Sequence, residues 1–180
     1  MDLSDFGNWK EIEGHPNYEV SDQGFVLGKK RMKILTGNTN VSGYPTVKLS
    51  HNGICETCFI HKLVARAFLD NPNSHAFVDH TDHNKLNNNV GNLRWCTRSE
   101  NNRNTTKRSD TMSSSYKGVS WFKHQRKWCA RIYVNCKRQC LGYFDSEVQA
   151  AVAYNNAAIH HFTEFACLNT IPIESVADDA

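Results

Sequence analysis

The 180-residue sequence predicts an α+β protein made of small modules. Short aromatic and β-branched runs, separated by turn residues, fill the first third of the chain. A strand–loop–strand–helix order follows within about 30 residues, and three more strands and a helix come after a stretch rich in Ser and Thr. Because domains of about 50 residues fold alone when well packed, the chain has room for two or three modules.

The first module, assigned to residues 1–70, is rich in short strands. "TVKLS" and "ICETCFI" flank His51-Asn52-Gly53, which is typical of a hairpin turn. "IHKLVARAF" then changes to helical spacing, which predicts a short helix. Asn71-Pro72 should end that helix, since the residue before a proline disfavours helical geometry.

The second module, assigned to residues 71–105, should contain a strand over "AFVDH", a polar loop and a second strand over "NLRWC". The capping-box sequence "TRSE" predicts a helix that begins at Arg98. This helix should carry Asn101 and Asn104 in its first two turns.

The third module, residues 116–170, follows a linker at 106–115 and precedes a loose tail at 171–180. Its second strand alternates, so one face should carry Trp128, Ala130, Ile132 and Val134, and the other Lys127, Cys129, Arg131 and Tyr133. A second capping box, "SEVQ", starts a helix that suits the apolar face. We therefore expect a three-stranded antiparallel sheet with one packed helix and an open, basic face.

Charge is distributed unevenly along the chain. The segment from Arg94 to Arg138 carries a net charge of +10, which leaves −7 for the rest of a chain whose total is +3. Such asymmetry favours a local surface for a polyanion, although a solvated basic surface is the alternative. No export signal or run long enough to span a bilayer is present, so we expect no membrane partner. Seven irregularly spaced cysteines favour a reducing, cytoplasmic setting.

The stretch "VDHTDHNKLNNNVGNLRWCTRSENNRN" carries the residues of chemical interest. Hydrolysis of a phosphodiester needs a base to activate water and a cation to neutralise developing charge. A histidine suits the first task, and carboxylate and amide oxygens suit a hard cation such as Mg²⁺. Asp79, His80, Asn92 and Asn101 supply these groups, although strand alternation turns Asp79 and His80 apart unless the strand ends there. The alternative is an ordinary polar loop.

The spacing of these four residues resembles that of the HNH homing endonucleases of the His-Me-finger (ββα-metal) class: an Asp-His pair, an asparagine twelve residues after the histidine, and a third polar residue nine further on. "NWKEIEGHPNYEVSDQGFV" resembles the nuclease-associated modular motif found ahead of such enzymes. Residues 116–169, with "YKGV" and "LGYFDS", are similar to the ethylene-response-factor (APETALA-type) DNA-binding domain.

This resemblance implies a role for each residue. His80 would be the general base, and Asn92 would bond to the loop backbone and so orient His80. Asp79 and Asn101 would hold one Mg²⁺ or Mn²⁺, with Asn101 in place of the family's histidine favouring an oxygen-only site. Asn102 and Asn104 compete with Asn101, and the second Asp-His pair, Asp82-His83, lies three residues too close to Asn92.

DNA contacts are expected along the basic segment and on the open sheet face. In the carboxy-terminal module the resemblance implies Lys117, Ser120, Phe122, Arg131, Tyr133, Arg138 and Cys140, and alternation adds Lys127 and agrees on Arg131 and Tyr133. At Ser120, Phe122 and Cys140 this chain lacks arginines and tryptophans that the family has. The DNA sequence recognised must therefore differ from the family's, or the contacts must be mainly to phosphates. Lys107 and Arg108 in the linker, with Arg94 and Arg98, complete the expected set.

Cys55-x-x-Cys58 suggests zinc, but a structural site needs four ligands, and only His51, His61 and Cys96 are candidates to complete it. We expect buried strand cysteines and no structural zinc.

Together these features predict a metal-dependent endonuclease of the homing type that nicks double-stranded DNA as a monomer in a phage-infected bacterium. One alternative is an inert DNA-binding regulator built from the same modules, and another is a zinc-stabilised structural or RNA-binding protein.

Overall fold

The computed structural model describes residues 2–104 and 113–172. These residues belong to two compact units, Met1–Asn101 and Asn102–Ala180. Most of the expected linker and tail lie outside the described residues. No helix within the described ranges combines the length and apolar character that a bilayer crossing requires.

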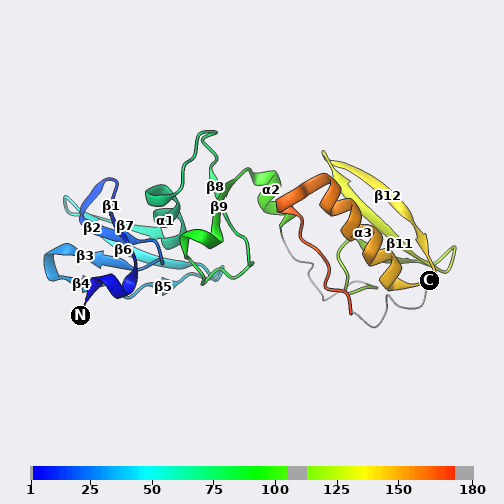
Figure 1. Ribbon diagram of the computed structural model, residues 1–180, viewed down its shortest axis with the longest axis horizontal. Helices are drawn as coiled ribbons and strands as arrows, with labels where there is room; N and C mark the ends of the chain where they lie inside the picture. Colours follow the sequence, from blue (N-terminus) through cyan, green and yellow to red (C-terminus); the bar gives the residue numbers. More distant parts are fainter. Residues whose placement is uncertain (1, 105–112, 173–180) are drawn as a thin grey trace. The chain divides into compact units, whose positions relative to one another are not determined.

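The amino-terminal unit contains three small antiparallel sheets, and the first two precede its longer helix in the chain (Figure 1). The first has the order β1-β2-β3-β4, with β1 Trp9–Ile12, β2 His15–Ser21, β3 Val26–Gly28 and β4 Lys33–Ile34. The 3₁₀ turns η1 Leu3–Phe6 and η2 Lys29–Arg31 lie at the start of the chain and between β3 and β4. The second sheet has the order β5-β6-β7, with β5 Asn38–Thr39, β6 Pro45–His51 and β7 Ile54–Phe59.

The β6–β7 hairpin confirms the turn expected at Asn52-Gly53. His51 pairs with Ile54, and the two residues between them have positive φ angles of 50° and 79°. Two consecutive left-handed residues give a turn whose twist matches that of the flanking strands. The turn sets the register of the whole hairpin and thereby places Cys58 opposite Val47.

Helix α1, Ile60–Phe68, follows β7 directly and packs into the core of this unit. Val20, Leu49 and Val64 are fully buried there, and Val78 and Leu93 from the next segment belong to the same cluster. The expected module boundary between residues 70 and 71 therefore lies within one hydrophobic core and does not separate two. Residues on both sides of it bury their apolar surface together, because neither the small sheets nor the following hairpin has enough apolar area alone.

The strand–loop–strand–helix order expected after α1 is confirmed. β8, Phe77–His80, pairs antiparallel with β9, Leu93–Cys96, and the short 3₁₀ turn η3, Val90–Asn92, leads into β9. Helix α2, Arg98–Arg103, begins where the capping box predicts.

The box itself forms in both directions. The Thr97 N–H donates to Oε2 of Glu100 at 2.7 Å, and the Glu100 N–H donates to Oγ1 of Thr97 at 3.3 Å. The helix is shorter than expected, since Asn104 follows its end. A single capped turn and a half is marginal without further packing.

The carboxy-terminal unit is a three-stranded antiparallel sheet, β10-β11-β12, packed against α3, as the sequence predicts. The elements are β10 Val119–Phe122, β11 Lys127–Val134, β12 Lys137–Phe144, α3 Glu147–Phe162 and the 3₁₀ turn η4 Thr163–Phe165. Ser146 caps α3 through a 3.2 Å bond from the Val148 N–H.

Small residues let α3 approach the sheet closely. Figure 1 shows α3 lying along the sheet. Ala150, Ala151 and Ala158 are fully buried at the contact, where they meet Ala130 and Ile132 of β11. The apolar face deduced from alternation is thus the one that the helix covers. The opposite face of the sheet carries no helix within the described residues of this unit.

Candidate functional site

Asn92 organises the loop that follows His80. Its Oδ1 accepts hydrogen bonds from Oγ1 of Thr81 at 2.7 Å and from the Asp82 N–H at 3.0 Å. Its Nδ2 donates to Oδ1 of Asp82 and to the Asn87 carbonyl, each at 2.8 Å. A buried asparagine with all these bonds made fixes the loop against the start of β9, because breaking them would leave polar groups without partners.

The second Asp-His pair takes part in this loop rather than in a second site. Burial raises the pKa of Asp82, but hydrogen bonds from Asn87, the Asn84 N–H and Asn92 outweigh it and hold the pKa below its ordinary value. His83 has a left-handed φ of 61° and donates its backbone N–H to the His80 carbonyl at 3.1 Å. The pair therefore shapes the turn.

His80 is buried at the end of β8, and its Nε2 lies 3.2 Å from Oδ1 of Asn88. The Asn88 amide donates through Nδ2 to the Leu86 carbonyl, so its oxygen faces the histidine. An amide oxygen only accepts, and Nε2 of His80 must therefore carry the hydrogen. In the neutral ring, Nδ1 is then the nitrogen with the basic lone pair.

Two aromatic residues that were not expected at this site lie against His80. The ring of His61 on α1 is centred 5.2 Å from the His80 ring, and the Tyr44 ring is centred 6.1 Å from it. Nδ1 of His61 is buried and has no hydrogen-bond partner among the described residues. Burial, with the neighbouring His80 and Lys62, lowers the pKa of His61 to about 3, so this ring is neutral at physiological pH.

A signal for His61 was present in the sequence. It precedes Val64 by three residues and Phe68 by seven, which is the spacing of one helix face. The helical pattern thus placed His61 on the buried side of α1, although nothing in the pattern placed it beside His80.

Asp79 is buried and forms an ion pair with Arg94, its cross-strand partner. Nε and Nη2 of Arg94 lie 3.0 and 2.8 Å from Oδ2 of Asp79. Arg94, expected to contact DNA, is therefore engaged by the carboxylate expected to bind metal. The reason is register: residues directly opposite in an antiparallel pair have side chains on the same face.

Tyr44 lies close to both members of the first Asp-His pair. Burial raises its pKa, and the charge of Asp79 raises it further, while its ring packs on His80. The strand ends at His80, which is the condition under which the two side chains can serve one region. Asn101 lies half-buried on α2, with its backbone N–H bonded to the Thr97 carbonyl at 3.0 Å, and Arg98 is exposed at the start of that helix.

The open face of the carboxy-terminal sheet gathers most of the residues expected there. Strand register pairs Phe122 with Lys127, Ser120 with Cys129, Arg131 with Cys140 and Tyr133 with Arg138. Phe122 and Tyr143 add a ring contact with centroids 5.2 Å apart. The face is thus a mixture of aromatic and cationic side chains, which suits a polyanion that also presents flat rings.

Three residues of this region have partners within the protein. Cys129 is buried beneath it, because Arg131 donates from Nε to its Sγ at 3.2 Å and Cys140 lies 3.7 Å away. Lys127 is paired with Asp145 at 3.3 Å. Lys117 precedes β10, and its half-buried ammonium donates to the Arg103 carbonyl at 2.5 Å; burial lowers its pKa. Lys107 and Arg108 lie outside the described residues.

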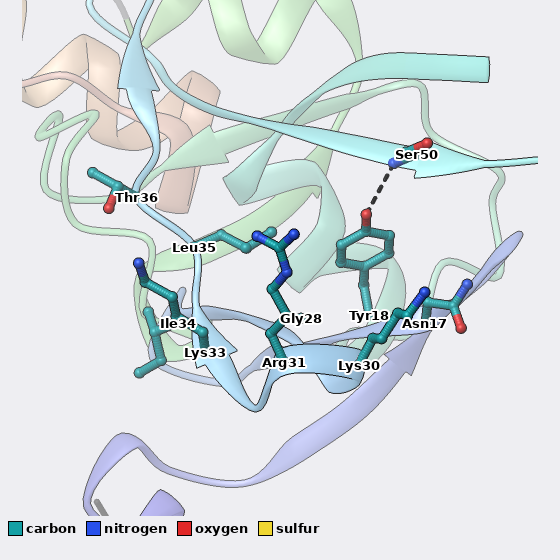
Figure 2. A pocket seen from close by; sticks show the side chains of 10 residues that line it. All are labelled: Asn17, Tyr18, Gly28, Lys30, Arg31, Lys33, Ile34, Leu35, Thr36 and Ser50. Atoms are coloured by element: carbon teal, nitrogen blue, oxygen red, sulfur yellow. Dashed lines mark hydrogen bonds between the residues drawn. The ribbon is translucent and has the colours of Figure 1, made fainter. Parts of the chain in front are cut away.

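The amino-terminal unit also has a basic pocket of about 500 Å³, outside the segment that the charge count singled out (Figure 2). Lys30, Arg31 and Lys33 line it, with Tyr18 at one side. Oη of Tyr18 accepts a 3.2 Å bond from the Ser50 N–H and so joins β2 to β6. These cations are adjacent in the sequence, in "KKRMK", but the net charge does not reveal them because acids elsewhere in the unit offset it.

Comparison with known proteins identifies the family. The profile described as "HNH endonuclease" matches residues 58–103, and the "NUMOD4 motif" matches residues 8–50. The chain is 34% identical over 119 residues to DNA endonuclease I-HmuI of Bacillus phage SP01, covering 66% of this chain and 68% of that protein. The chain therefore belongs to the HNH endonuclease family.

Other relatives agree on the family over shorter spans. H-N-H endonuclease F-TflII of Escherichia phage T5 is 38% identical over 55% of this chain and 52% of its own length. Uncharacterized HNH endonuclease L245 of Acanthamoeba polyphaga mimivirus is 38% identical over 52% of this chain but only 28% of its own length. The solved structure titled "DNA binding and cleavage by the HNH homing endonuclease I-HmuI" aligns with a TM-score of 0.50 at 38% identity, covering 54% of this chain and 56% of that one.

Proposed function

We propose that this protein is a homing-type DNA endonuclease that hydrolyses a phosphodiester bond in double-stranded DNA with one divalent metal ion, Mg²⁺ or Mn²⁺. The observation that carries the proposal is the tautomer of His80. Its Nε2–H is held by Asn88, so Nδ1 is the basic nitrogen of a buried histidine at the end of β8, next in the chain to the buried Asp79. The order of β8, β9 and α2 along the chain supports the proposal of a ββα-metal core.

The proton transfer follows from these contacts. Nδ1 of His80 takes a proton from the attacking water, and the Nε2–H···Oδ1 bond to Asn88 strengthens as the ring becomes positive. The neighbouring His61 stays neutral, so it adds no charge that would oppose this step. Asn92 contributes indirectly, because it fixes Thr81 and Asp82, the two residues directly after the base.

The donor set fits a hard cation. Asp79 supplies a buried carboxylate and Asn101 an amide oxygen, which are ligand types that Mg²⁺ and Mn²⁺ accept. When bound, such an ion supplies positive charge to the scissile phosphate and the leaving oxygen. Arg94 holds the Asp79 carboxylate in place with two bonds and adds a further positive charge beside it.

DNA recognition is assigned to two regions. The open face of the carboxy-terminal sheet, with Arg131, Tyr133 and Arg138, would act as an ethylene-response-factor-like reading surface, and the linker cations Lys107 and Arg108 would follow the backbone. A tethered second unit raises the local concentration of DNA at the nuclease. We expect a monomer that nicks one strand in the cytoplasm of a phage-infected bacterium.

The test is cleavage of supercoiled DNA carrying the genomic flanks of the gene, with Mg²⁺ present. His80→Ala should abolish nicking, since the general base contributes about 10²–10⁴-fold. His83→Asn is the matched control, because the residue is an exposed neighbour and asparagine tolerates its left-handed backbone. Tight DNA binding without cleavage by the unaltered protein would instead support the inert DNA-binding regulator.

A further inference from the structure

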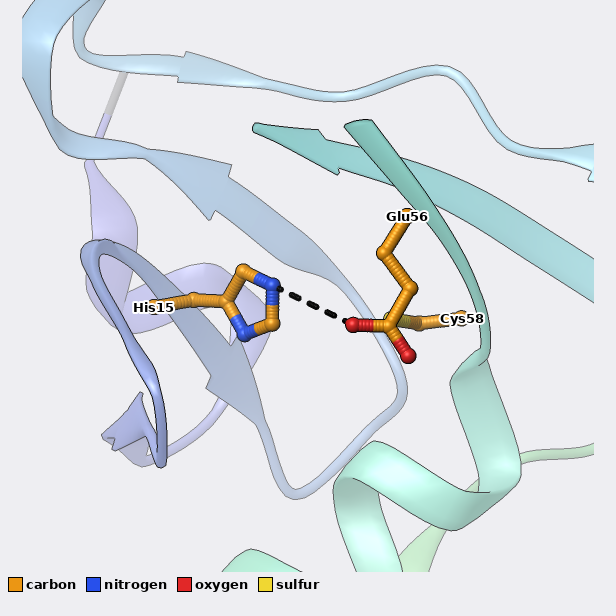
Figure 3. A group of neighbouring side chains, drawn as sticks. All are labelled: His15, Glu56 and Cys58. Atoms are coloured by element: carbon orange, nitrogen blue, oxygen red, sulfur yellow. Dashed lines mark ion pairs between the residues drawn. The ribbon is translucent and has the colours of Figure 1, made fainter. Parts of the chain in front are cut away.

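A second group of metal-ligand side chains lies in the amino-terminal unit, in the two sheets rather than at the β8–β9 hairpin. His15 on β2 and Glu56 and Cys58 on β7 each offer one ligand atom, and all three atoms lie within 4.8 Å of one another (Figure 3). Nε2 of His15 is 3.8 Å from Oε2 of Glu56. The group therefore brings together residues that are about forty positions apart in the sequence.

The strand period explains which cysteine takes part. Glu56 and Cys58 are two residues apart on β7 and share a face, whereas Cys55 and Cys58 are three apart and point to opposite faces. The Cys-x-x-Cys pair seen in the sequence is thus no chelate, and neither cysteine is buried as expected: Cys55 is exposed and Cys58 half-buried. Cys58 has a free thiol beside an imidazole and a carboxylate.

The orientation of His15 favours a cation at this point. Its Nδ1 lies 3.4 Å from the Glu13 carbonyl, which only accepts, so Nδ1 carries the hydrogen. Nε2 then directs its lone pair towards the Glu56 carboxylate. Two acceptors facing each other are favourable only with a cation or a proton between them. A backbone carbonyl on the far nitrogen is also the usual support of a metal-bound histidine.

We propose that His15, Glu56 and Cys58 bind one Zn²⁺ ion, with water or His51 as the fourth ligand. Nitrogen, oxygen and sulfur donors together suit zinc, while a thiolate disfavours Mg²⁺. Bond lengths of about 2.0–2.3 Å put tetrahedral ligand atoms roughly 3.5 Å apart, so the group must contract by about 1 Å. Glu56 can supply this movement, since its side chain is 66% exposed. The ring of His51 is centred 6.4 Å from that of His15.

Metal binding would connect the first two sheets of the unit. β2 belongs to the first sheet and β7 to the second, and β7 continues directly into α1, which carries His61. The group borders a pocket of about 240 Å³, so an ion can enter from solvent. Zinc binding releases the thiol proton of Cys58 to solvent, so the affinity for zinc rises with pH. Burial and the charge of Glu56 raise the pKa of this thiol, and the charge of Arg66 opposes them.

The test is titration of the chelator-treated full-length protein with Co²⁺, followed by displacement with Zn²⁺. A thiolate-to-cobalt charge-transfer band that saturates at one equivalent is expected. Cys58→Ser should remove this band, and His15→Ala should weaken binding by more than about 100-fold, since even outer contacts cost 10–100-fold. Cys55→Ser, on the same strand but the opposite face, is the matched control and should retain both band and affinity.

A second measurement avoids substitutions altogether. In the unaltered protein, Zn²⁺ should slow alkylation of Cys58 while leaving that of the exposed Cys55 unchanged, as read by peptide mass spectrometry. Absence of the cobalt band in folded protein, a band that persists in Cys58→Ser, or alkylation of Cys58 that Zn²⁺ does not slow would each overturn the proposal. None of these outcomes bears on Mg²⁺-dependent nicking, which is scored separately with His80→Ala.

Discussion

Replacing His61 with leucine should make the stability of the amino-terminal unit less sensitive to acid. In the unfolded chain this histidine takes up a proton near pH 6.5, whereas in the folded protein its pKa is about 3. Because the unfolded state binds more protons between these values, stability is lost as the pH falls from 6.5 towards 3. The linkage relation gives a loss of about 2 kcal/mol between pH 7 and pH 5 from this residue, and about 5 kcal/mol in full.

The assay is urea unfolding of the full chain at pH 7 and pH 5. Pulsed hydrogen exchange of peptides from β6 reports on this unit alone, since Leu49 lies at the centre of its core. The unaltered protein should lose about 2 kcal/mol more than His61→Leu between the two pH values. His83→Asn should behave like the unaltered protein. Equal losses in the unaltered protein and in His61→Leu would refute the argument that burial keeps this ring neutral.

Three further predictions follow from packing and loop geometry. Leu49→Ala should destabilise the amino-terminal unit by about 2–5 kcal/mol in the same unfolding assay, because the side chain is fully buried. Gly118→Ala should destabilise the carboxy-terminal unit by more than about 2 kcal/mol in thermal unfolding, since φ is +76° and a Cβ would stand 2.0 Å from the Tyr154 ring. Gly53→Ala is the control: φ is also positive there but the space around it is open, so the substitution should cost about 1 kcal/mol. Asn92→Ala should reduce nicking by about 100-fold or more through misplacement of the His80 loop, and unchanged nicking would contradict the positioning role.

Local sequence patterns predicted the secondary-structure elements well wherever one local rule, such as turn geometry, capping or strand alternation, determines the structure. The Asn52-Gly53 turn, the Thr97–Glu100 capping box and the alternation of β11 each depend on neighbouring residues, and each appears in the structure. The strand predicted over "AFVDH" ends at His80, and Asn92 bonds to the loop backbone, as the family resemblance implies. The chemical roles given to them remain proposals.

Other features depended on packing between distant segments. The expected module boundary at residue 70 fails to divide the core, because α1 and the β8–β9 hairpin bury apolar residues together. Cys129 is buried on a face predicted to be open, since the Arg131 side chain covers it and donates to its sulfur. The group of His15, Glu56 and Cys58 combines residues whose proximity no local spacing encodes.

The sequence by itself determined the period of each element, the caps and turns that bound it, and the residue types available for phosphodiester chemistry. Only the tertiary structure decided their partners: Arg94 on Asp79, Asn88 and His61 on His80, and His15 on Cys58 rather than Cys55. The physical reason is that capping, turn geometry and alternation act over a few residues along the chain. Ion pairs, tautomers and metal-ligand groups depend instead on strand register and on which faces are buried together.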